Sequence, residues 1–402
     1  MISLVKVLLL ATTFLTLTIA SAVEEREAPA PNFGDNIQLR GELSRSKLKF
    51  QNTKTGTVAF LGGSITEMNG YRPMVMENLK KRFPETAFKF INAGISSTTS
   101  TTGAFRLDHD VLTDGPVDLL FVEFAVNDDQ DGHHSRLECI RAMEGIIRHA
   151  RKSNPEMDII ITYFVNEGML QTLQSGKTPL TVEAHETVAK HYDISTVHLA
   201  REVAAEITAG KLTWKTYGGV HPAPAGNTIC AKMIEDLLTR SWISKSNDSP
   251  AKEMRSLQAA LDSLNYENGR FIDPSKATIK HGFTLGIPDW TQIAGSKRDR
   301  FMHISMLCST EPGAECTLQF EGTAVGVYVV AGPDAGLLDG TIDGVPFQEV
   351  NLFHAFSSGL HYPRTVLLAG DLKPGSHVLV LSVAESSKTT VKAARIIEFV
   401  AN

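Results

Sequence analysis

The chain has 402 residues, of which 42% are hydrophobic and 21% charged, and its formal net charge is -6 at pH 7. This composition is typical of a soluble globular protein, and the length exceeds that of one ordinary domain. The sequence contains no block of Lys or Arg, which argues against nucleic acid or an anionic membrane as the main partner. We therefore expect two globular domains whose ligand is neither of these.

The N-terminus has the pattern of a secretory signal. Lys6 precedes an apolar run from Val7 to Ala20, and the small residues Ala20-Ser21-Ala22 are followed by charged residues. This pattern predicts a signal peptide over residues 1–22, cleaved after Ala22, and a secreted or periplasmic protein with no membrane association after cleavage. An uncleaved anchor is the alternative, which the short apolar run disfavours.

Beyond an N-terminal extension (residues 23–56), residues 57–240 alternate apolar strands with amphipathic helices. Between the strands, apolar residues recur at three-to-four spacing, and a last helix covers 224–242. Such alternation predicts a parallel sheet with helices on both faces, in which ligands collect at the C-terminal ends of strands. The expected strands are 57–62, 88–94, 117–125, 158–165 and 193–200.

The last 160 or so residues have a different pattern. Residues 241–280 are polar and predict a linker or bracing segment with one helix over 251–264. Residues 281–402 show short period-two runs separated by turn signals, which predicts a smaller all-β domain, a sandwich or jelly roll. Two cysteines of this domain, Cys308 and Cys316, flank a Pro-Gly turn and are either bridged or free thiols.

Four sequence blocks fall at strand ends of the first domain. Ser64 follows the first strand and two glycines, Gly94 ends the second strand, and Asn127 comes just past the third. His221 stands just before the last helix. These residues should converge on one edge of the sheet, although a helix-capping serine and a surface histidine are the simpler interpretations of each alone.

Acyl transfer requires these groups. A serine hydroxyl becomes a good nucleophile when a base such as histidine takes its proton. The tetrahedral intermediate needs hydrogen-bond donors, which here would be the N–H of Ser64, the N–H of Gly94 and the side-chain amide of Asn127. This chemistry needs neither a metal nor another cofactor, and no Cys/His spacing in the sequence is typical of a zinc site.

In order and context, Ser64, Gly94, Asn127 and His221 resemble the four conserved blocks of the SGNH/GDSL hydrolase superfamily. The resemblance covers roughly residues 57–240. It implies a flavodoxin-like three-layer α/β fold and the hydrolysis of esters, often on carbohydrates.

Two positions depart from the pattern of this family. Gly218 stands where the family usually has an aspartate, three residues before the histidine, and Ala125 replaces a glycine of the third block. The first change removes the expected orienter of the His221 ring. A backbone carbonyl or another carboxylate could orient the ring instead, and the candidate carboxylates are Asp128, Asp131 and Glu67.

Two further features of the first domain have more than one interpretation. Residues 127–138 fit the spacing of a calcium-binding EF-hand loop, but a strand precedes them, so we disfavour calcium. Glu123 lies inside an apolar strand, and we expect Arg106 to pair with it as structural support beneath the site.

Aromatic residues offer possible contacts with a sugar. Trp214 and Tyr217 could line a sugar-binding wall, or they could simply be packed in the domain. In the β domain, the polar and aromatic segment 352–364 could bind glycan or contact the first domain.

Together these features predict a secreted serine esterase that removes small acyl groups, most simply acetyl, from a carbohydrate by a Ser-His acyl-enzyme mechanism. The alternative is a hydrolase-like protein that has lost activity and binds glycans or surfaces, which Gly218 would favour. A lipase or thioesterase is a lesser alternative. The sequence does not indicate the oligomeric state.

Overall fold

The computed structural model describes residues 33–41, 43–243, 257–385 and 392–402. The predicted signal peptide and the first part of the N-terminal extension lie outside these ranges. Phe33–Asn402 group together as one compact unit, which contains both an α/β domain and a β domain. The boundaries expected between the domains remain predictions.

A six-stranded sheet forms the centre of the α/β domain. Its strand order is β1-β6-β5-β4-β2-β3, with β1 antiparallel to β6 and the other five strands parallel. The parallel strands follow the flavodoxin-like order, which places the topological switch point between β2 and β4. The strands are β1 (Ile37–Gln38), β2 (Thr55–Gly62), β3 (Ala87–Gly94), β4 (Leu119–Glu123), β5 (Asp158–Thr162) and β6 (Ser195–Val197).

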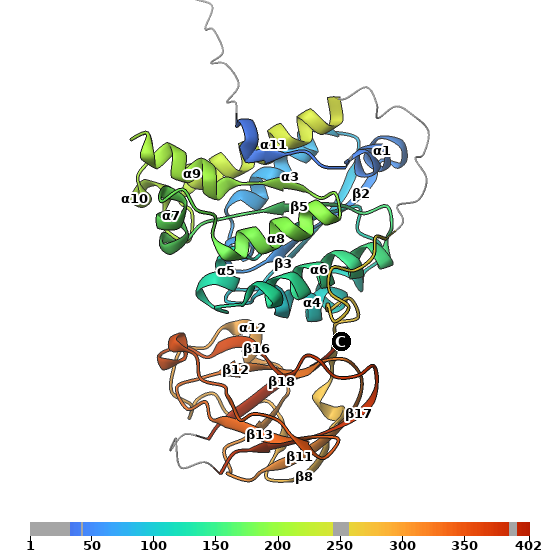
Figure 1. The fold of residues 1–402 in the computed structure, drawn as a ribbon, viewed down its shortest axis with the longest axis vertical. Coiled ribbons are helices and arrows are strands. Elements are labelled where there is room, and N and C mark those ends of the chain that lie inside the picture. The colour runs from blue at the N-terminus through green and yellow to red at the C-terminus, as the bar shows by residue number, and fades with distance from the viewer. Residues whose placement is uncertain (1–32, 42, 244–256, 386–391) are drawn as a thin grey trace, which may run out of the picture. The chain divides into compact units, whose positions relative to one another are not determined.

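Helices cover both faces of this sheet, which confirms the predicted three-layer class (Figure 1). One face carries α1 (Ser44–Thr53), α3 (Tyr71–Arg82) and α11 (Pro224–Ile243); the other carries α4 (Ser100–Leu107), α6 (Arg136–Ser153) and α8 (Leu180–His191). The other helices described in this domain are η1 (Gly34–Asn36), α2 (Ser64–Glu67), α5 (Ala125–Gln130), α7 (Glu167–Gln174), α9 (Leu199–Thr208), α10 (Trp214–Tyr217) and a π-helix, η2 (Asp108–Leu112).

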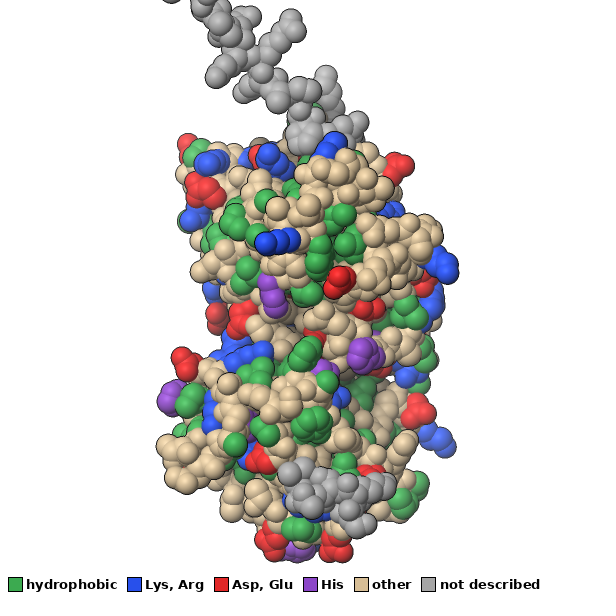
Figure 2. Space-filling model, turned by 90° about the vertical axis from the view of Figure 1, so that its left-hand side faces the viewer, with side chains coloured by type: hydrophobic (Ala, Val, Ile, Leu, Met, Phe, Trp, Pro, Cys, Tyr) green, Lys and Arg blue, Asp and Glu red, His purple; other side chains and the backbone are tan. Residues whose placement is uncertain are grey.

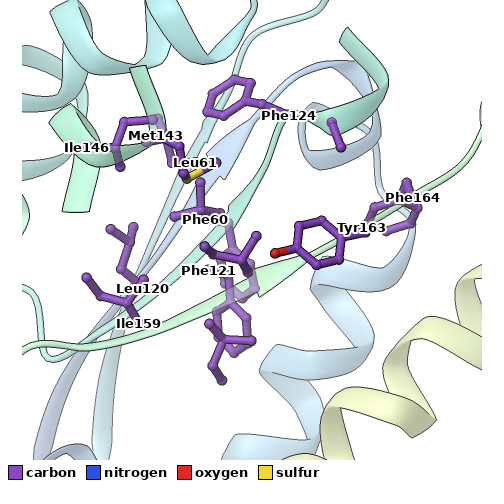
Figure 3. Packing of buried hydrophobic residues seen from close by; sticks show 14 of the residues in the cluster. Phe60, Leu61, Leu120, Phe121, Phe124, Met143, Ile146, Ile159, Tyr163 and Phe164 are labelled. Atoms are coloured by element: carbon purple, nitrogen blue, oxygen red, sulfur yellow. The ribbon is translucent and has the colours of Figure 1, made fainter. Parts of the chain in front are cut away.

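The central strands are apolar on both faces because helices exclude water from both. Residues 58–61 of β2 are fully buried, as expected of a parallel strand inside a three-layer fold. The rings of Phe60 and Phe121 stack with their centroids 4.8 Å apart. Figure 3 shows the side chains of β2, β4 and β5 packed with Met143 and Ile146 of α6.

In the part of the chain that the structure describes, no helix has the length and apolar character needed to cross a membrane. On the face drawn in Figure 2, acidic and basic side chains are interspersed, without a large patch of either charge.

Two antiparallel six-stranded sheets form the β domain. One has the order β16-β12-β18-β10-β9 with β7 paired to β18, and the other has the order β14-β13-β17-β11-β8 with β15 paired to β13. Their inner faces share one hydrophobic cluster, as in a sandwich. The strands are β7 (Arg270–Ile272), β8 (Thr278–His281), β9 (Thr284–Gly286), β10 (Met306–Ser309), β11 (Glu315–Gly322), β12 (Val325–Ala331), β13 (Leu337–Ile342), β14 (Val345–Pro346), β15 (Val350–Asn351), β16 (Tyr362–Ala369), β17 (Gly375–Val383) and β18 (Ala394–Ala401).

Strand β12 departs from the period-two pattern because both of its faces are buried. Val327 and Val329 belong to the cluster between the two β sheets, whereas Tyr328 and Val330 belong to the large core cluster of the α/β domain. One sheet of the β domain therefore packs against the other β sheet on one side and against the α/β domain on the other.

The two cysteines for which a bridge was considered are free thiols. Cys308 lies in β10 and Cys316 in β11, which belong to different sheets. Burial raises the pKa of Cys308 to about 11 and that of Cys316 to about 12, so both thiols stay protonated near neutral pH.

The helix predicted over 251–264 is wrong for residues 257–264, which form turns and irregular structure, while 251–256 lie outside the described residues. The buried carboxylate of Glu144 in α6 accepts the N–H of Leu261 at 2.6 Å and the N–H of Asp262 at 2.9 Å. The hydroxyl of Tyr192 donates to the same carboxylate at 2.6 Å. These long-range bonds replace the local bonds that a helix would make.

Glu144→Ala should lower the free energy of unfolding by about 2–4 kcal/mol, because three buried or half-buried donors lose their acceptor. Glu183→Ala is the matched control: Glu183 is a half-exposed glutamate of α8 paired with Arg136 at 2.8 Å. Its loss should cost no more than about 1 kcal/mol. Urea denaturation of both variants tests this, and equal losses would contradict it.

Candidate active site

Ser64 begins α2, and Gly63 separates it from Gly62, the last residue of β2. Its Oγ lies 2.8 Å from Nε2 of His221, which is 157 residues away in the chain. A Cβ on Gly62 would lie 2.4 Å from Glu123 Oε1, and one on Gly63 would lie 2.2 Å from Asn127 Oδ1. The turn before Ser64 therefore needs both glycines, because side chains from the next strand and helix fill the space.

This contact has the geometry that general-base catalysis requires. When Nε2 of His221 is unprotonated, the Ser64 hydroxyl can donate to it, and the ring can take the proton as the oxygen attacks. Ser64 is half-buried and His221 is exposed, so the pair can be reached from solvent.

Three groups were predicted as oxyanion donors, and their states differ. The Ser64 N–H is in the first turn of α2, where helical N–H groups have no partner inside the helix. The Asn127 amide donates one N–H to Asp131 at 2.7 Å, which leaves its second N–H. The Gly94 N–H donates to the side-chain oxygen of Asn92 at 3.1 Å; Asn92 is exposed, so its side chain can rotate away.

The predicted pair between Arg106 and Glu123 is wrong. The fully buried guanidinium of Arg106 donates to the carbonyl of Ala93 at 2.7 Å and to that of Gly62 at 2.9 Å. It also pairs with Asp110 at 2.8 Å, one turn further along the same helical segment. Arg106 thus joins the ends of β2 and β3, and it fixes the peptide between Ala93 and Gly94.

Glu123 supports the serine turn through backbone and hydroxyl donors instead. Its Oε1 accepts the N–H of Gly63 at 3.0 Å, the N–H of Thr66 at 3.2 Å and the hydroxyl of Thr66 at 2.8 Å. Its Oε2 is buried without a hydrogen-bond partner. Burial raises the pKa of Glu123 to about 7, and these hydrogen bonds oppose part of that rise.

None of the carboxylates considered as an orienter for His221 contacts its ring. Asp128 accepts from Ser100 and His185, Asp131 from Asn127, and Glu67 from Ser96. Among the described residues, Ser64 is the hydrogen-bond partner of His221. Ser64 and His221 therefore form a hydrogen-bonded pair, and no carboxylate among the described residues binds the ring.

The conformation of Gly218 explains why the aspartate is missing. Gly218 ends α10 with φ of 109°, and a Cβ there would lie 2.0 Å from the backbone N of Ala223. No residue with a side chain fits this position without a shift of the backbone. The loop that carries His221 therefore has a backbone conformation that leaves no space for an aspartate at position 218.

Comparison with known proteins agrees with this geometry. Residues 60–229 match the sequence model of the GDSL-like Lipase/Acylhydrolase family. We refer to residues 60–229 as the GDSL-like domain, after the family whose model they match. This match includes Ser64, Gly94, Asn127 and His221, and it agrees with their resemblance to the blocks of the SGNH/GDSL superfamily.

Solved structures share both domains of this chain. A two-domain esterase (CEX) active on acetylated mannans, co-crystallized with mannopentaose, is 22% identical with a TM-score of 0.72. A second structure of a two-domain esterase (CEX) active on acetylated mannans is 24% identical with a TM-score of 0.71. Each match covers 91% of this chain and 97% of the other, so the architecture is common to both. Among curated protein sequences, no significant match was found.

Of the two aromatic residues proposed as a substrate wall of the GDSL-like domain, Tyr217 is excluded. Its side chain is fully buried and stacks on Trp214 with a centroid distance of 5.5 Å. The sequence could not distinguish this packing from an exposed wall, because both need an aromatic residue near His221. Trp214 is half-buried, and its contact with substrate stays a prediction.

The GDSL-like domain does not form an EF-hand at residues 127–138. Asp129 accepts from Asn166 at 2.8 Å, and Glu138 accepts from Thr101 at 2.5 Å and from Tyr266 at 2.7 Å, so the calcium ligands do not converge.

A different group in this domain has the composition of a metal site. The ligand atoms of Asp128, His134 and Cys139 lie within 4.8 Å of one another. Both oxygens of Asp128 already accept hydrogen bonds, from the Ser100 N–H at 2.8 Å, the Ser100 hydroxyl at 2.6 Å and His185 at 2.9 Å. These bonds fix α4 and α8 to the segment after Asn127, and they account for the buried carboxylate without an ion.

Gly218→Asp should not restore a triad. We expect it to lower the free energy of unfolding by about 2–4 kcal/mol, because it adds both positive-φ strain and a backbone clash, and to leave kcat unimproved. Gly219→Asp is the control: its φ is 73° and no heavy atom lies within 4 Å of an added Cβ. That variant should lose only about 1 kcal/mol. Urea denaturation and ester hydrolysis test this, and a stable, faster Gly218→Asp enzyme would contradict it.

Glu123 should make stability depend on pH. Between its ordinary value of 4.5 and its raised pKa of about 7, the folded protein keeps the proton that the unfolded chain releases. The free energy of unfolding therefore falls as pH rises through this window. Relative to Glu123→Gln, the wild type should lose roughly 2–3 kcal/mol from pH 4.5 to 7. Denaturation at pH 4.5, 6 and 7.5 measures the difference, and parallel profiles would contradict it.

Proposed function

We propose that the chain is a secreted serine esterase that removes small acyl groups, acetyl above all, from carbohydrate. The observation that carries the proposal is the 2.8 Å contact between Ser64 Oγ and His221 Nε2 at the C-terminal edge of the parallel sheet. The proposed nucleophile and base lie near opposite ends of the GDSL-like domain in sequence. Ester hydrolysis explains their hydrogen bond better than a role in folding does.

The reaction follows from these positions. Ser64 Oγ attacks the ester carbonyl while Nε2 of His221 takes the hydroxyl proton. The new oxyanion accepts hydrogen bonds from the Ser64 N–H, from the Asn127 amide and, once Asn92 rotates, from the Gly94 N–H. His221 then returns the proton to the departing sugar oxygen, which leaves an acyl-enzyme. Water activated by the same ring adds to the acyl group and regenerates Ser64.

Three observations support a carbohydrate as the alcohol. The signal-like N-terminus predicts export, and CEX, which shares the architecture, is active on acetylated mannans. In the segment 352–364, Phe353 and Phe356 are exposed by 36% and 52%. Between them, Nε2 of His354 donates to the backbone carbonyl of Asp131 at 3.0 Å. The carboxylate of Asp131 in turn accepts a hydrogen bond from the Asn127 amide. The segment that carries these exposed rings is thus connected to Asn127 through Asp131, and the rings can pack on sugar rings.

The alternative, an inactive glycan-binding or surface-interaction protein, is favoured by the missing aspartate at Gly218. An inactive domain would have no need to keep Ser64 and His221 in hydrogen-bond contact. Dyads without an orienting carboxylate retain a base and an oxyanion site, which supply much of the rate.

Ser64→Ala should reduce hydrolysis of a short-chain aryl acetate by at least about a thousandfold, because the acyl-enzyme cannot form. Ser175→Ala, at an exposed serine at the end of α7, should keep the wild-type rate. Release of acetate from acetylated mannan and xylan by the wild type then tests the substrate class. Equal rates for the wild type and Ser64→Ala would reject the proposal in favour of an inactive binding protein.

A further inference from the structure

Each backbone carbonyl from residue 93 to residue 97, at the end of β3 and in the loop that follows, accepts a hydrogen bond from a side chain. This run contains Gly94 and the first part of the β3–α4 loop (residues 95–99). The donors are Arg106 to Ala93 at 2.7 Å, Arg300 to Gly94 at 3.2 Å, Thr98 to Ile95 at 2.7 Å, Arg298 to Ser96 at 2.9 Å and Tyr362 to Ser97 at 3.3 Å. Three of these five donors belong to the β domain.

Arg300 also reaches the element that carries Ser64. Its guanidinium lies 3.3 Å from Oε1 of Glu67, the last residue of α2. The other oxygen of Glu67 accepts the N–H of Ser96 at 2.8 Å. One arginine of the β domain therefore connects the serine helix with the loop after β3.

The β3–α4 loop needs such support because its backbone is strained. Ser97 has φ of 73°, a left-handed conformation that costs a residue with a side chain on the order of 1 kcal/mol or more. Arg298 donates to the Ser96 carbonyl and to the Ser97 hydroxyl, each at 2.9 Å, so it binds the strained residue directly. Strained loops persist where surrounding contacts fix them, and here the contacts come from another domain.

The β domain can serve as a rigid support. Phe301, which follows Arg300 in α12 (Asp299–Met302), is buried in the core cluster shared with the α/β domain. Tyr362 is also buried, and burial raises its pKa, so its hydroxyl stays protonated and donates. Arg298 is half-buried, and the Arg300 side chain, although 38% exposed, projects from the same short helix as the buried Phe301.

We propose that Arg298, Arg300 and Tyr362 of the β domain are positioning residues for ester hydrolysis, because they hold the loop next to Gly94 in its active conformation. This inference rests on the proposed esterase function. It assigns to the β domain a role in the rate of the chemical step, beyond any role in binding a glycan. Misplacing an oxyanion donor by about 1 Å can cost up to a hundredfold in rate.

The test uses the full chain and an aryl acetate too small to reach a glycan-binding surface. Arg298→Met/Arg300→Met should lower kcat about ten- to a hundredfold with KM within about twofold, because the transition state loses stabilisation that the bound ester does not use. The conservative Arg298→Lys/Arg300→Lys should recover part of the loss. Hydrogen–deuterium exchange of residues 94–99 should rise in the Met variant.

Arg270→Met is the matched control, since Arg270 in β7 also donates to a backbone carbonyl, that of Glu321 at 2.7 Å, within the β domain. It should keep the wild-type kcat. An unchanged kcat in the double variant, or an equal loss in Arg270→Met, would overturn this inference. The proposed function would still hold as long as hydrolysis depends on Ser64. If the wild type shows no such hydrolysis, the exchange data still decide, and unchanged exchange at residues 94–99 would overturn the inference.

Discussion

A buried guanidinium joins the ends of the two strands that precede Ser64 and carry Gly94. Arg106 binds the carbonyls of Gly62 and Ala93, and Asp110 balances its charge. The register of β2 and β3, with Gly62 opposite Gly94, brings these carbonyls within reach of one side chain. A neutral residue at this position could not bind both, and the edge of the sheet on which the site stands would lose its fixed spacing.

A second buried group acts on the same edge from the neighbouring strand. Glu123 accepts from the two N–H groups on either side of Ser64 and Ile65, those of Gly63 and Thr66. One cation thus fixes the carbonyls of the strand ends, and one carboxyl group fixes the amides of the serine turn. Arg106 binds backbone carbonyls and Glu123 binds backbone N–H groups, so each is satisfied without an ion pair between them.

Periodicity and the order of motifs were enough to predict the α/β class, the sheet edge and the residues that meet there. Ser64 and His221 could be matched because strand ends in such sheets converge whatever the loop details. The partners of Glu123 could not be predicted, because pairing charges in the sequence ignores backbone and hydroxyl donors, and its donors among the described residues are all of these two kinds. The burial of Tyr217 and the turn at Leu261 were missed for a related reason: each depends on long-range contacts that leave no local pattern. Likewise β12 was counted among the period-two runs, although all of its residues are buried between two layers.

The conformation of Gly218 also limits how this site can change over generations. An aspartate could return there only if residue 223 moved as well, and either change alone would damage the loop that delivers His221. A lineage that has adopted this turn is therefore separated from the three-residue arrangement by intermediates that fold poorly. Selection for faster turnover would find it easier to act on the arginines of the neighbouring domain, or on what surrounds the exposed imidazole, than to rebuild the triad.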